Sequence, residues 1–165
     1  MSLQGTPVMV TGANGFIGSR LVDRLVEAGA DVRALVRSKA DAPRWTTNPR
    51  RRAVRGDVTD PASIARAVAG CEVVFHCAWG GESMEESRLV NVEGTRHVLR
   101  AAAEAGVRRI VHVSSMAVHG GALPPVLTEA CSLVVEGDPY SVGKAEGERL
   151  AFELGKELGL EVTAF

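Results

Sequence analysis

The sequence has few cysteines and no cysteine-rich motif. Cys71, Cys77 and Cys131 are an odd number, and none of them stands in a CxxC or a Cys/His spacing. This pattern predicts neither a disulfide framework nor a zinc site. We therefore interpret all three as reduced, packed thiols and assign no metal ligand.

Long apolar runs and an excess of charge of one sign are also missing. No stretch approaches the roughly 18 consecutive apolar residues of a membrane span, and no charged segment followed by an apolar one marks a secretory signal. The net charge is −1, from 19 basic and 20 acidic residues, so nucleic acid and membranes are not expected partners. We expect a cytoplasmic protein. The run Arg50-Arg51-Arg52 is interpreted as a solvated loop ahead of an apolar strand.

What the sequence does contain is a regular alternation of strand-length apolar runs and helix-length amphipathic stretches. This alternation is typical of βαβ units. Strands that are apolar on both faces predict an α/β fold with a doubly wound parallel (Rossmann) sheet, in one domain over residues 4–165. The expected strands lie near residues 8–10, 32–36, 53–54, 73–75, 110–113 and 162–165, and the chain ends inside the sixth. The expected helices lie near residues 15–28, from 61 onward with Asp60 as N-cap, near 85–105 and near 140–158.

Residues 120–138 form the one long candidate loop, with Pro124-Pro125 inside it. The loop comes directly before the last expected helix, and long ordered loops are often functional. We therefore predict that it acts as a flap over the ligand crevice, which in doubly wound sheets lies beyond the carboxyl ends of the strands.

The first expected strand leads into a glycine-rich turn, residues 11–18 (TGANGFIG). Gly12 and Gly15 let the backbone turn tightly and approach a pyrophosphate, and Gly18 lets the next helix pack close to the sheet. The helix N-terminus then offers free N–H groups and a partial positive charge to the phosphates. An ordinary strand-to-helix turn is the alternative interpretation, which the position after the first strand disfavours.

A tyrosine and a lysine stand four positions apart at the start of the last expected helix. Tyr140 is the only tyrosine in the chain, and Lys144 shares its helix face. A free phenol has a pKa of about 10, and a nearby cation favours the phenolate, which is the tuning that acid–base catalysis requires. Two ordinary helix-surface neighbours are the alternative. Upstream, Ser115 ends a strand; its hydroxyl could donate to a reacting oxygen or could serve as a strand-end cap.

Taken in this order, the motifs resemble the extended short-chain dehydrogenase/reductase family (NAD-dependent epimerase/dehydratase, dihydroflavonol-reductase-like), in its N-terminal Rossmann portion. The TGxxGxxG turn is similar to that of the family, as are Gly56-Asp57-Val58, His76-Cys77-Ala78 and the NxxGT segment at residues 91–95. Two positions depart from the pattern, because Trp79 stands where the family usually has Ala and His119 where it often has Tyr.

The resemblance implies that Ser115, Tyr140 and Lys144 are catalytic. In the family the tyrosine exchanges a proton with the substrate oxygen while hydride moves to or from the nicotinamide, and the lysine also bonds the nicotinamide ribose. We interpret His112 and His119 as structural or surface residues. The implied cofactor-binding residues are Gly12, Asn14, Gly15, Phe16, Ile17, Gly18, Arg37, Asp57, Val58, Cys77, Ala78, Asn91, Ser114 and Lys144.

The end of the second strand bears on which nicotinamide cofactor is used. Residues 35–38 (LVRS) contain no carboxylate to accept the ribose hydroxyls of NAD. Arg37 offers a planar fork suited to the 2′-phosphate of NADP, and Ser38 offers a second donor. We predict that NADP(H) is preferred and that NAD(H) is the second option. A surface arginine without a ligand is the alternative.

The expected function is that of an NAD(P)-dependent oxidoreductase acting on a carbonyl or a secondary alcohol. A nucleotide-sugar epimerase or dehydratase would use the same cofactor and the same Ser/Tyr/Lys site, and a non-catalytic dinucleotide-binding module is a third reading. The expected partners are a small-molecule substrate, either a carbonyl or alcohol or a nucleotide sugar, and as one option a second copy in a homodimer. Because family members are normally longer, the resemblance implies that the C-terminal substrate domain is absent from this chain, and an inactive fragment is one expected outcome.

Overall fold

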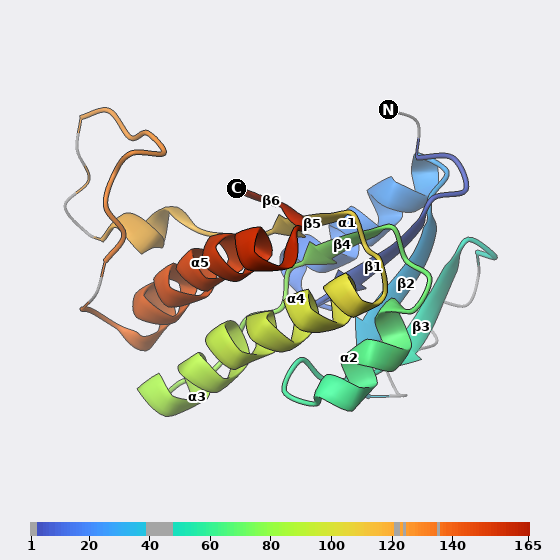
Figure 1. Ribbon diagram of the computed structural model, residues 1–165, viewed down its shortest axis with the longest axis horizontal. Coiled ribbons are helices and arrows are strands. Elements are labelled where there is room, and N and C mark those ends of the chain that lie inside the picture. The colour runs from blue at the N-terminus through green and yellow to red at the C-terminus, as the bar shows by residue number, and fades with distance from the viewer. Residues whose placement is uncertain (1–2, 39–47, 121–122, 124, 135) are drawn as a thin grey trace.

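The computed structural model describes residues 3–38, 48–120, 123, 125–134 and 136–165. In these ranges six strands form one sheet in the order β3-β2-β1-β4-β5-β6, with every neighbouring pair parallel (Figure 1). The strand order reverses beside β1, which places the ligand-binding switch point between β1 and β4. The predicted fold class is confirmed. The strands are β1 (Pro7–Thr11), β2 (Asp31–Val36), β3 (Arg51–Arg55), β4 (Val73–His76), β5 (Arg109–His112) and β6 (Glu161–Ala164).

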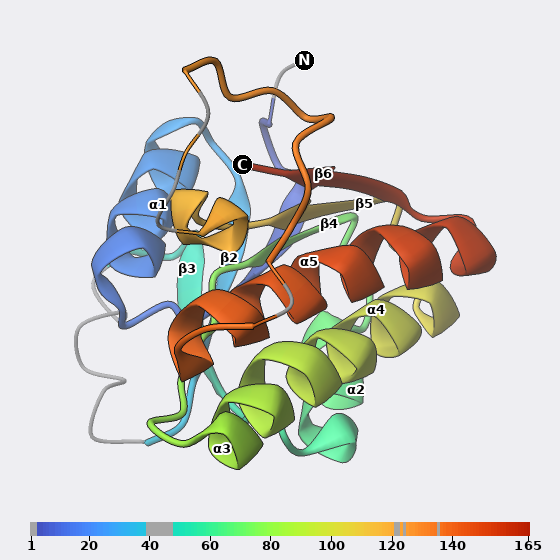
Figure 2. The ribbon, with the colours of Figure 1, turned by 90° about the vertical axis from the view of Figure 1, so that its left-hand side faces the viewer.

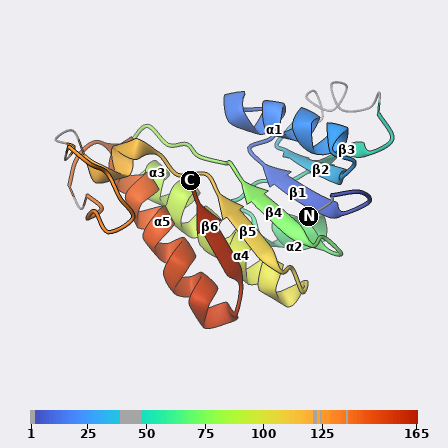
Figure 3. The same cartoon turned by 90° about the horizontal axis from the view of Figure 1, so that it is seen from above.

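Helices cover both faces of the sheet. Helix α1 lies on one face, and α2, α4 and α5 lie side by side on the other (Figures 2 and 3). Asp60 caps α2 by accepting from Ala62 N, and Pro61 begins the helix, both as predicted. The helices are α1 (Phe16–Glu27), α2 (Pro61–Val68), α3 (Met84–Arg88), α4 (Gly94–Glu104) and α5 (Pro139–Leu158), with a π turn (Leu89–Glu93) joining α3 to α4 and a 3-10 turn (Met116–His119) after β5.

Two apolar cores flank the central strands. Val8 and Val10 of β1 pack on the α1 side with Val22, whereas Met9 packs on the other side with Leu99 of α4. Successive side chains of a strand point to opposite faces, so the residues of β1 enter the two cores alternately. This double burial explains why the strand is continuously apolar.

The arginine run lies partly in an edge strand and not in a solvated loop, so that prediction was wrong for Arg51 and Arg52. Both residues begin β3, which pairs with β2 on one side only. Arg51 forms an ion pair with Asp23 at 2.6 Å, and Arg50, just before the strand, pairs with Asp31 at 3.1 Å. Charged side chains are suited to an edge strand because they hinder pairing with another chain.

The helix expected near residues 85–105 runs without interruption through α3, the π turn and α4, and the periodicity did not reveal the π turn inside it. Helix α5 packs directly on α3 and on this turn: a Cβ on Gly143 would lie 2.1 Å from Ser87 Oγ of α3, and one on Gly147 would lie 2.5 Å from the Asn91 carbonyl oxygen of the π turn. The π turn inserts one extra residue into the helical repeat. The two glycines of α5 are therefore packing residues that bring Lys144, which lies between them, close to the π turn.

The long candidate loop at residues 120–138 is described only in part, since residues 121, 122, 124 and 135 lie outside the described ranges. Its described residues form turns and bends, and Val134 N donates to the Val118 carbonyl at 2.8 Å. The flap role stays a prediction. In the described part of the chain no helix is long and apolar enough to cross a membrane. All three cysteines are free thiols; Cys71 and Cys77 are buried, and Cys131 is only half-buried.

Candidate functional site

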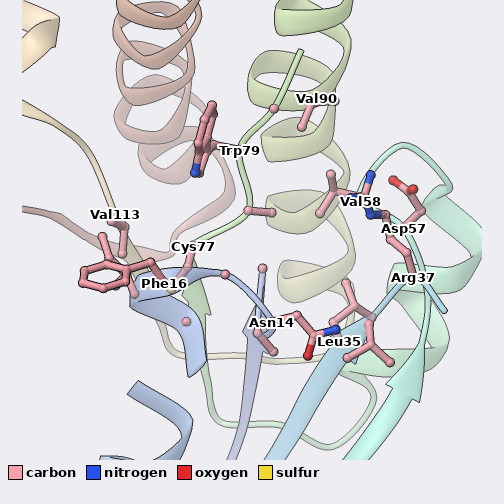
Figure 4. A pocket seen from close by; sticks show the side chains of 18 of the residues that line it. Asn14, Phe16, Leu35, Arg37, Asp57, Val58, Cys77, Trp79, Val90 and Val113 are labelled. Carbon is pink, nitrogen blue, oxygen red and sulfur yellow. The ribbon is translucent and has the colours of Figure 1, made fainter. Parts of the chain in front are cut away.

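A pocket of about 890 Å³ opens at the carboxyl ends of β1, β2 and β4 (Figure 4). Its lining comes from the glycine-rich turn, the end of β2, the turn after β3, the segment after β4 and the first turn of α5. The pocket brings together every predicted cofactor residue except Asn91. It also contains Tyr140, whereas Ser115 is not part of the lining.

The glycine-rich turn forms one wall of the pocket and leaves no room for side chains at two positions. Gly12 has φ +62°, and a Cβ there would lie 2.7 Å from Ala78 N; a Cβ on Gly18 would lie 2.2 Å from the Gly12 carbonyl oxygen. Helix α1 begins at Phe16, and its N-cap, Gly15, provides no side-chain cap. The first N–H groups of α1 are thus left to a ligand, which is the arrangement that binds phosphate.

Gly15 and Gly18 of the turn should therefore respond differently to substitution by alanine. We expect Gly18→Ala to lower the free energy of unfolding by about 3 kcal/mol, because the methyl group overlaps a backbone carbonyl. Gly15→Ala meets only the Gly12 oxygen, at 3.1 Å, and should cost less than about 1 kcal/mol. Because Gly15 lines the pocket, the same change should still weaken NADP⁺ binding about tenfold. Urea unfolding and calorimetric titration measure the two effects; equal stability losses would contradict this account.

A buried histidine behind the pocket links β4 to the end of β1 and to α4. His76 Nδ1 lies 2.7 Å from Thr11 Oγ1, and His76 Nε2 lies 3.0 Å from Thr95 Oγ1. Thr95 donates to the Asn91 carbonyl at 2.6 Å, so its oxygen accepts from Nε2–H, and Thr11 accepts from Ala78 N at 3.1 Å and donates to Nδ1. One neutral tautomer satisfies the whole chain of bonds. Burial and the nearby His112 and Lys144 hold the pKa of His76 well below its usual range.

Asn91 lies behind the pocket wall and not in it. Its amide nitrogen donates to the Gly80 carbonyl at 3.0 Å and to Ser87 Oγ at 2.9 Å, and its oxygen accepts from Gly80 N at 3.3 Å. The side chain thus holds the segment after β4 against the π turn. Asn91 also borders a small second cavity together with Lys144 and His112.

Tyr140 and Lys144 both reach the pocket from α5. Asp138 caps this helix by accepting from Tyr140 N at 2.9 Å. The Lys144 side chain is buried, and its ammonium donates to the Val113 carbonyl. Burial lowers the pKa of Lys144 to about 8, which still leaves the group mostly protonated at neutral pH. The Tyr140 ring meets the Trp79 ring edge to face, with centroids 5.1 Å apart.

The two serines after β5 lie in different environments. Ser114 lines the pocket, and its buried hydroxyl has no hydrogen-bond partner among the described residues. Ser115 caps the 3-10 turn by accepting from Ala117 N at 3.2 Å, as in the strand-end-cap interpretation. An accepted bond leaves the hydroxyl proton of Ser115 free to donate. Its catalytic role stays a prediction.

Arg37 and Asp57 lie on the side of the pocket formed by β2 and the turn after β3 (Figure 4). Asp57 accepts from the backbone N and the hydroxyl of Thr59, both at 2.9 Å, which fixes its carboxylate in the turn. Arg37 is exposed, and no carboxylate of the described residues forms an ion pair with it. Its guanidinium is therefore available to a ligand.

The remaining histidines differ in burial. His112 is buried beside His76, with ring centroids 5.4 Å apart, and neither of its nitrogens has a partner among the described residues. Burial and Lys144 lower the pKa of His112 to about 3. His119 is half-buried, with Nδ1 3.2 Å from the Ser132 carbonyl. Among the described residues no group of His, Cys, Asp and Glu could hold a metal ion.

Sequence reasoning did not assign several residues of the lining. Trp79 was noted only as a departure from the family pattern, although it borders the pocket and touches Tyr140. The signal available was position alone, since residues directly after strands β2, β4 and β5 reach the ligand edge of a parallel sheet. The lining residues without a predicted role include Leu35, Val36, Trp79, Gly80, Gly81, Val90 and Val113.

Comparison with known proteins identifies the family. The model of the NAD dependent epimerase/dehydratase family matches residues 8–165. The chain belongs to this family. The extended short-chain dehydrogenase/reductase resemblance is thereby confirmed, and the NAD(P) cofactor class follows from it. The residues present fit a dinucleotide: the bare N-terminus of α1 and the tight turn at Gly12 border one pocket, which Ser114 and Lys144 also line.

Individual family members extend the comparison. The chain is 38% identical over 171 residues to cinnamoyl-CoA reductase 1 of Oryza sativa subsp. japonica and 37% identical over 180 residues to dihydroflavonol 4-reductase of Hordeum vulgare, covering 94% of this chain in each case. It superposes on dTDP-glucose 4,6-dehydratase (DesIV) of Streptomyces venezuelae, solved with NAD and TYD, with a TM-score of 0.86, 31% identity and 96% of this chain covered. The chain spans 51% and 50% of the two reductases and 54% of the dehydratase chain.

Proposed function

We propose that residues 4–165 are the dinucleotide-binding part of an NADP(H)-dependent oxidoreductase that acts on a carbonyl or a secondary alcohol. The observation that carries this proposal is that Tyr140 and Lys144 border the same pocket as the glycine-rich turn. A cofactor with its pyrophosphate at α1 and its adenosine toward Arg37 and Asp57 would leave its nicotinamide to the β4 and α5 side. The reductases among the relatives support the same chemistry.

Each residue has a definite task in this proposal. Bound NADP(H) supplies or takes up the hydride at the substrate carbon. In reduction the Tyr140 hydroxyl gives its proton to the carbonyl oxygen, and in oxidation the phenolate takes it back. Lys144 lies one helical turn from Tyr140 and borders the same pocket. Ser115 directly follows the lining residue Ser114, and its hydroxyl proton is available for donation to the reacting oxygen. Asn91 positions the wall after β4 through Gly80.

The preference for NADP(H) rests on Arg37 and can be tested by substitution. We expect Arg37→Ala to weaken NADP⁺ binding about tenfold while NAD⁺ binding stays unchanged, because the lost contact is with the 2′-phosphate. Calorimetric titration with both dinucleotides measures this. Arg52→Ala, which removes an exposed arginine of β3 outside the lining, is the control for net charge. The proposed preference would be wrong if NAD⁺ bound more tightly than NADP⁺ and if Arg37→Ala changed neither affinity.

A nucleotide-sugar epimerase or dehydratase is the second candidate. It is favoured by the solved structures, since DesIV was solved with NAD and TYD, and MoeE5, with 33% identity and a TM-score of 0.80, with UDP-glucose and NAD. Such an enzyme reduces and reoxidises its cofactor within one turnover. A reductase changes the nicotinamide absorbance in step with product, whereas an epimerase leaves it constant, so one absorbance trace with product analysis separates the two.

A further inference from the structure

Trp79 is an exposed aromatic residue at the mouth of the candidate site. The residue is 61% exposed, although burying a large apolar ring is favourable, and it lines the candidate cofactor pocket (Figure 4). The ring is held against the Tyr140 ring, edge to face at 5.1 Å. A tryptophan therefore stands beside the phenol, with more than half of its surface left for another molecule.

The described residues that line the pocket beside Trp79 offer no exposed positive charge that would suit a diphosphate. Among the described residues, three charged side chains occur in the pocket lining, namely Arg37, Asp57 and Lys144. Arg37 and Asp57 lie on the side of the pocket away from Trp79 (Figure 4), and the Lys144 ammonium is buried on the Val113 carbonyl. The neighbours of Trp79 along the lining are glycines and apolar residues: Ala78, Gly80, Gly81 and Val90.

We propose that Trp79 is a specificity-determining residue, and that it provides a flat apolar wall for a substrate whose carbonyl or alcohol is attached to a planar aromatic body. This inference rests on the proposed function, because it takes Tyr140 as the group that meets the substrate oxygen. An aromatic ring stacked on the free surface of the indole would place its attached oxygen next to the phenol that Trp79 touches. Alanine, the usual residue of the family at this position, would not provide such a wall.

The test uses the fact that the chain has only two tryptophans, Trp45 and Trp79. In a Trp45→Phe background the fluorescence reports Trp79 alone. The probes are NADP⁺, the planar ketone 2-acetylnaphthalene, its saturated counterpart decahydro-2-acetylnaphthalene and UDP-glucose. We expect the planar ketone to change Trp79 fluorescence saturably in the NADP⁺ complex and to bind about tenfold more tightly than the saturated ketone, with UDP-glucose causing no saturable change.

Substitution of Trp79 then shows whether the affinity for the ketone depends on an aromatic ring at this position, with affinities measured by calorimetry. Trp79→Ala should lower the affinity for the planar ketone about fivefold. Trp79→Phe, which keeps an aromatic face, should bind this ketone with an affinity within about twofold of that of the protein with Trp79. Unchanged ketone affinity in Trp79→Ala, tighter binding of UDP-glucose than of the ketone, or an equal loss of NADP⁺ affinity would each overturn the proposal. Failure of NADP⁺ to bind the Trp45→Phe protein would instead defeat the proposed function, so the two failures are distinguishable.

Discussion

Tyr140→Phe is expected to lower turnover about 100-fold or more while NADP⁺ binding stays unchanged. The substitution removes only the hydroxyl, and positioned proton transfer is typically worth a factor of about 10² to 10⁴. The phenylalanine ring keeps the edge-to-face contact with Trp79, so packing at the start of α5 is preserved. Turnover is followed by nicotinamide absorbance with a carbonyl substrate, and cofactor binding is followed by calorimetry.

The matched control for this substitution is Ser141→Ala. Ser141 is the next residue of α5, and its hydroxyl donates to Asp138 and not into the pocket. Ser141→Ala should therefore leave turnover close to that of the unaltered chain. Undiminished turnover in Tyr140→Phe would remove the phenol from the mechanism. Loss of NADP⁺ binding together with turnover would show instead that the ring serves the cofactor.

The folded chain is expected to lose about 4 kcal/mol of stability when the pH falls from 6.5 to 4.5. The pKa of His112 is lowered to about 3 by burial, and that of His76 lies well below its usual range. Both rings are neutral when folded, but they take up protons near pH 6.5 when unfolded. The unfolded state thus binds more protons below pH 6.5, and each histidine costs about 1.4 kcal/mol per pH unit. Urea unfolding at several pH values measures the loss.

Two substitutions identify the histidines as the cause. His112→Phe removes a ring that has no hydrogen-bond partner among the described residues, so it should cost little at pH 7 and remove about half of the acid-induced loss. His76→Phe should also reduce the loss but should cost about 2 kcal/mol at pH 7, because Thr11 and Thr95 lose their partner. Asp138, whose carboxylate has a lowered pKa, loses its contribution to the free energy of unfolding mainly at lower pH, where the carboxylate takes up a proton. An unchanged pH dependence in both variants would refute this assignment.

Much of the candidate site was predictable because its motifs are local in sequence. The turn at residues 11–18 and the Tyr140/Lys144 pair each lie within a few residues of one another, so a strand end or one helix face is enough to bring them together. Arg37 was found in the same way, from its position at the end of β2. All of these residues line one pocket.

Contacts between distant segments were not predictable from such patterns. The bond from Thr11 to His76 joins residues 65 positions apart, and no local periodicity encodes it. The contact between the Trp79 and Tyr140 rings joins the segment after β4 to the start of α5, and no sequence pattern links these two segments. The arginines of β3 were assigned to a loop because a charged edge strand has no apolar alternation.

The α/β fold, the tight glycine-rich turn and the shared helix face of Tyr140 and Lys144 follow from the sequence alone, because backbone freedom, strand burial and helical spacing are properties of neighbouring residues. Folding in three dimensions added the surroundings of these residues: a neutral His76 that joins β1 to α4, the burial of Lys144 that lowers its pKa, and an exposed tryptophan against the phenol. These features depend on burial and on contacts across the sheet, which come into being only when the chain has folded.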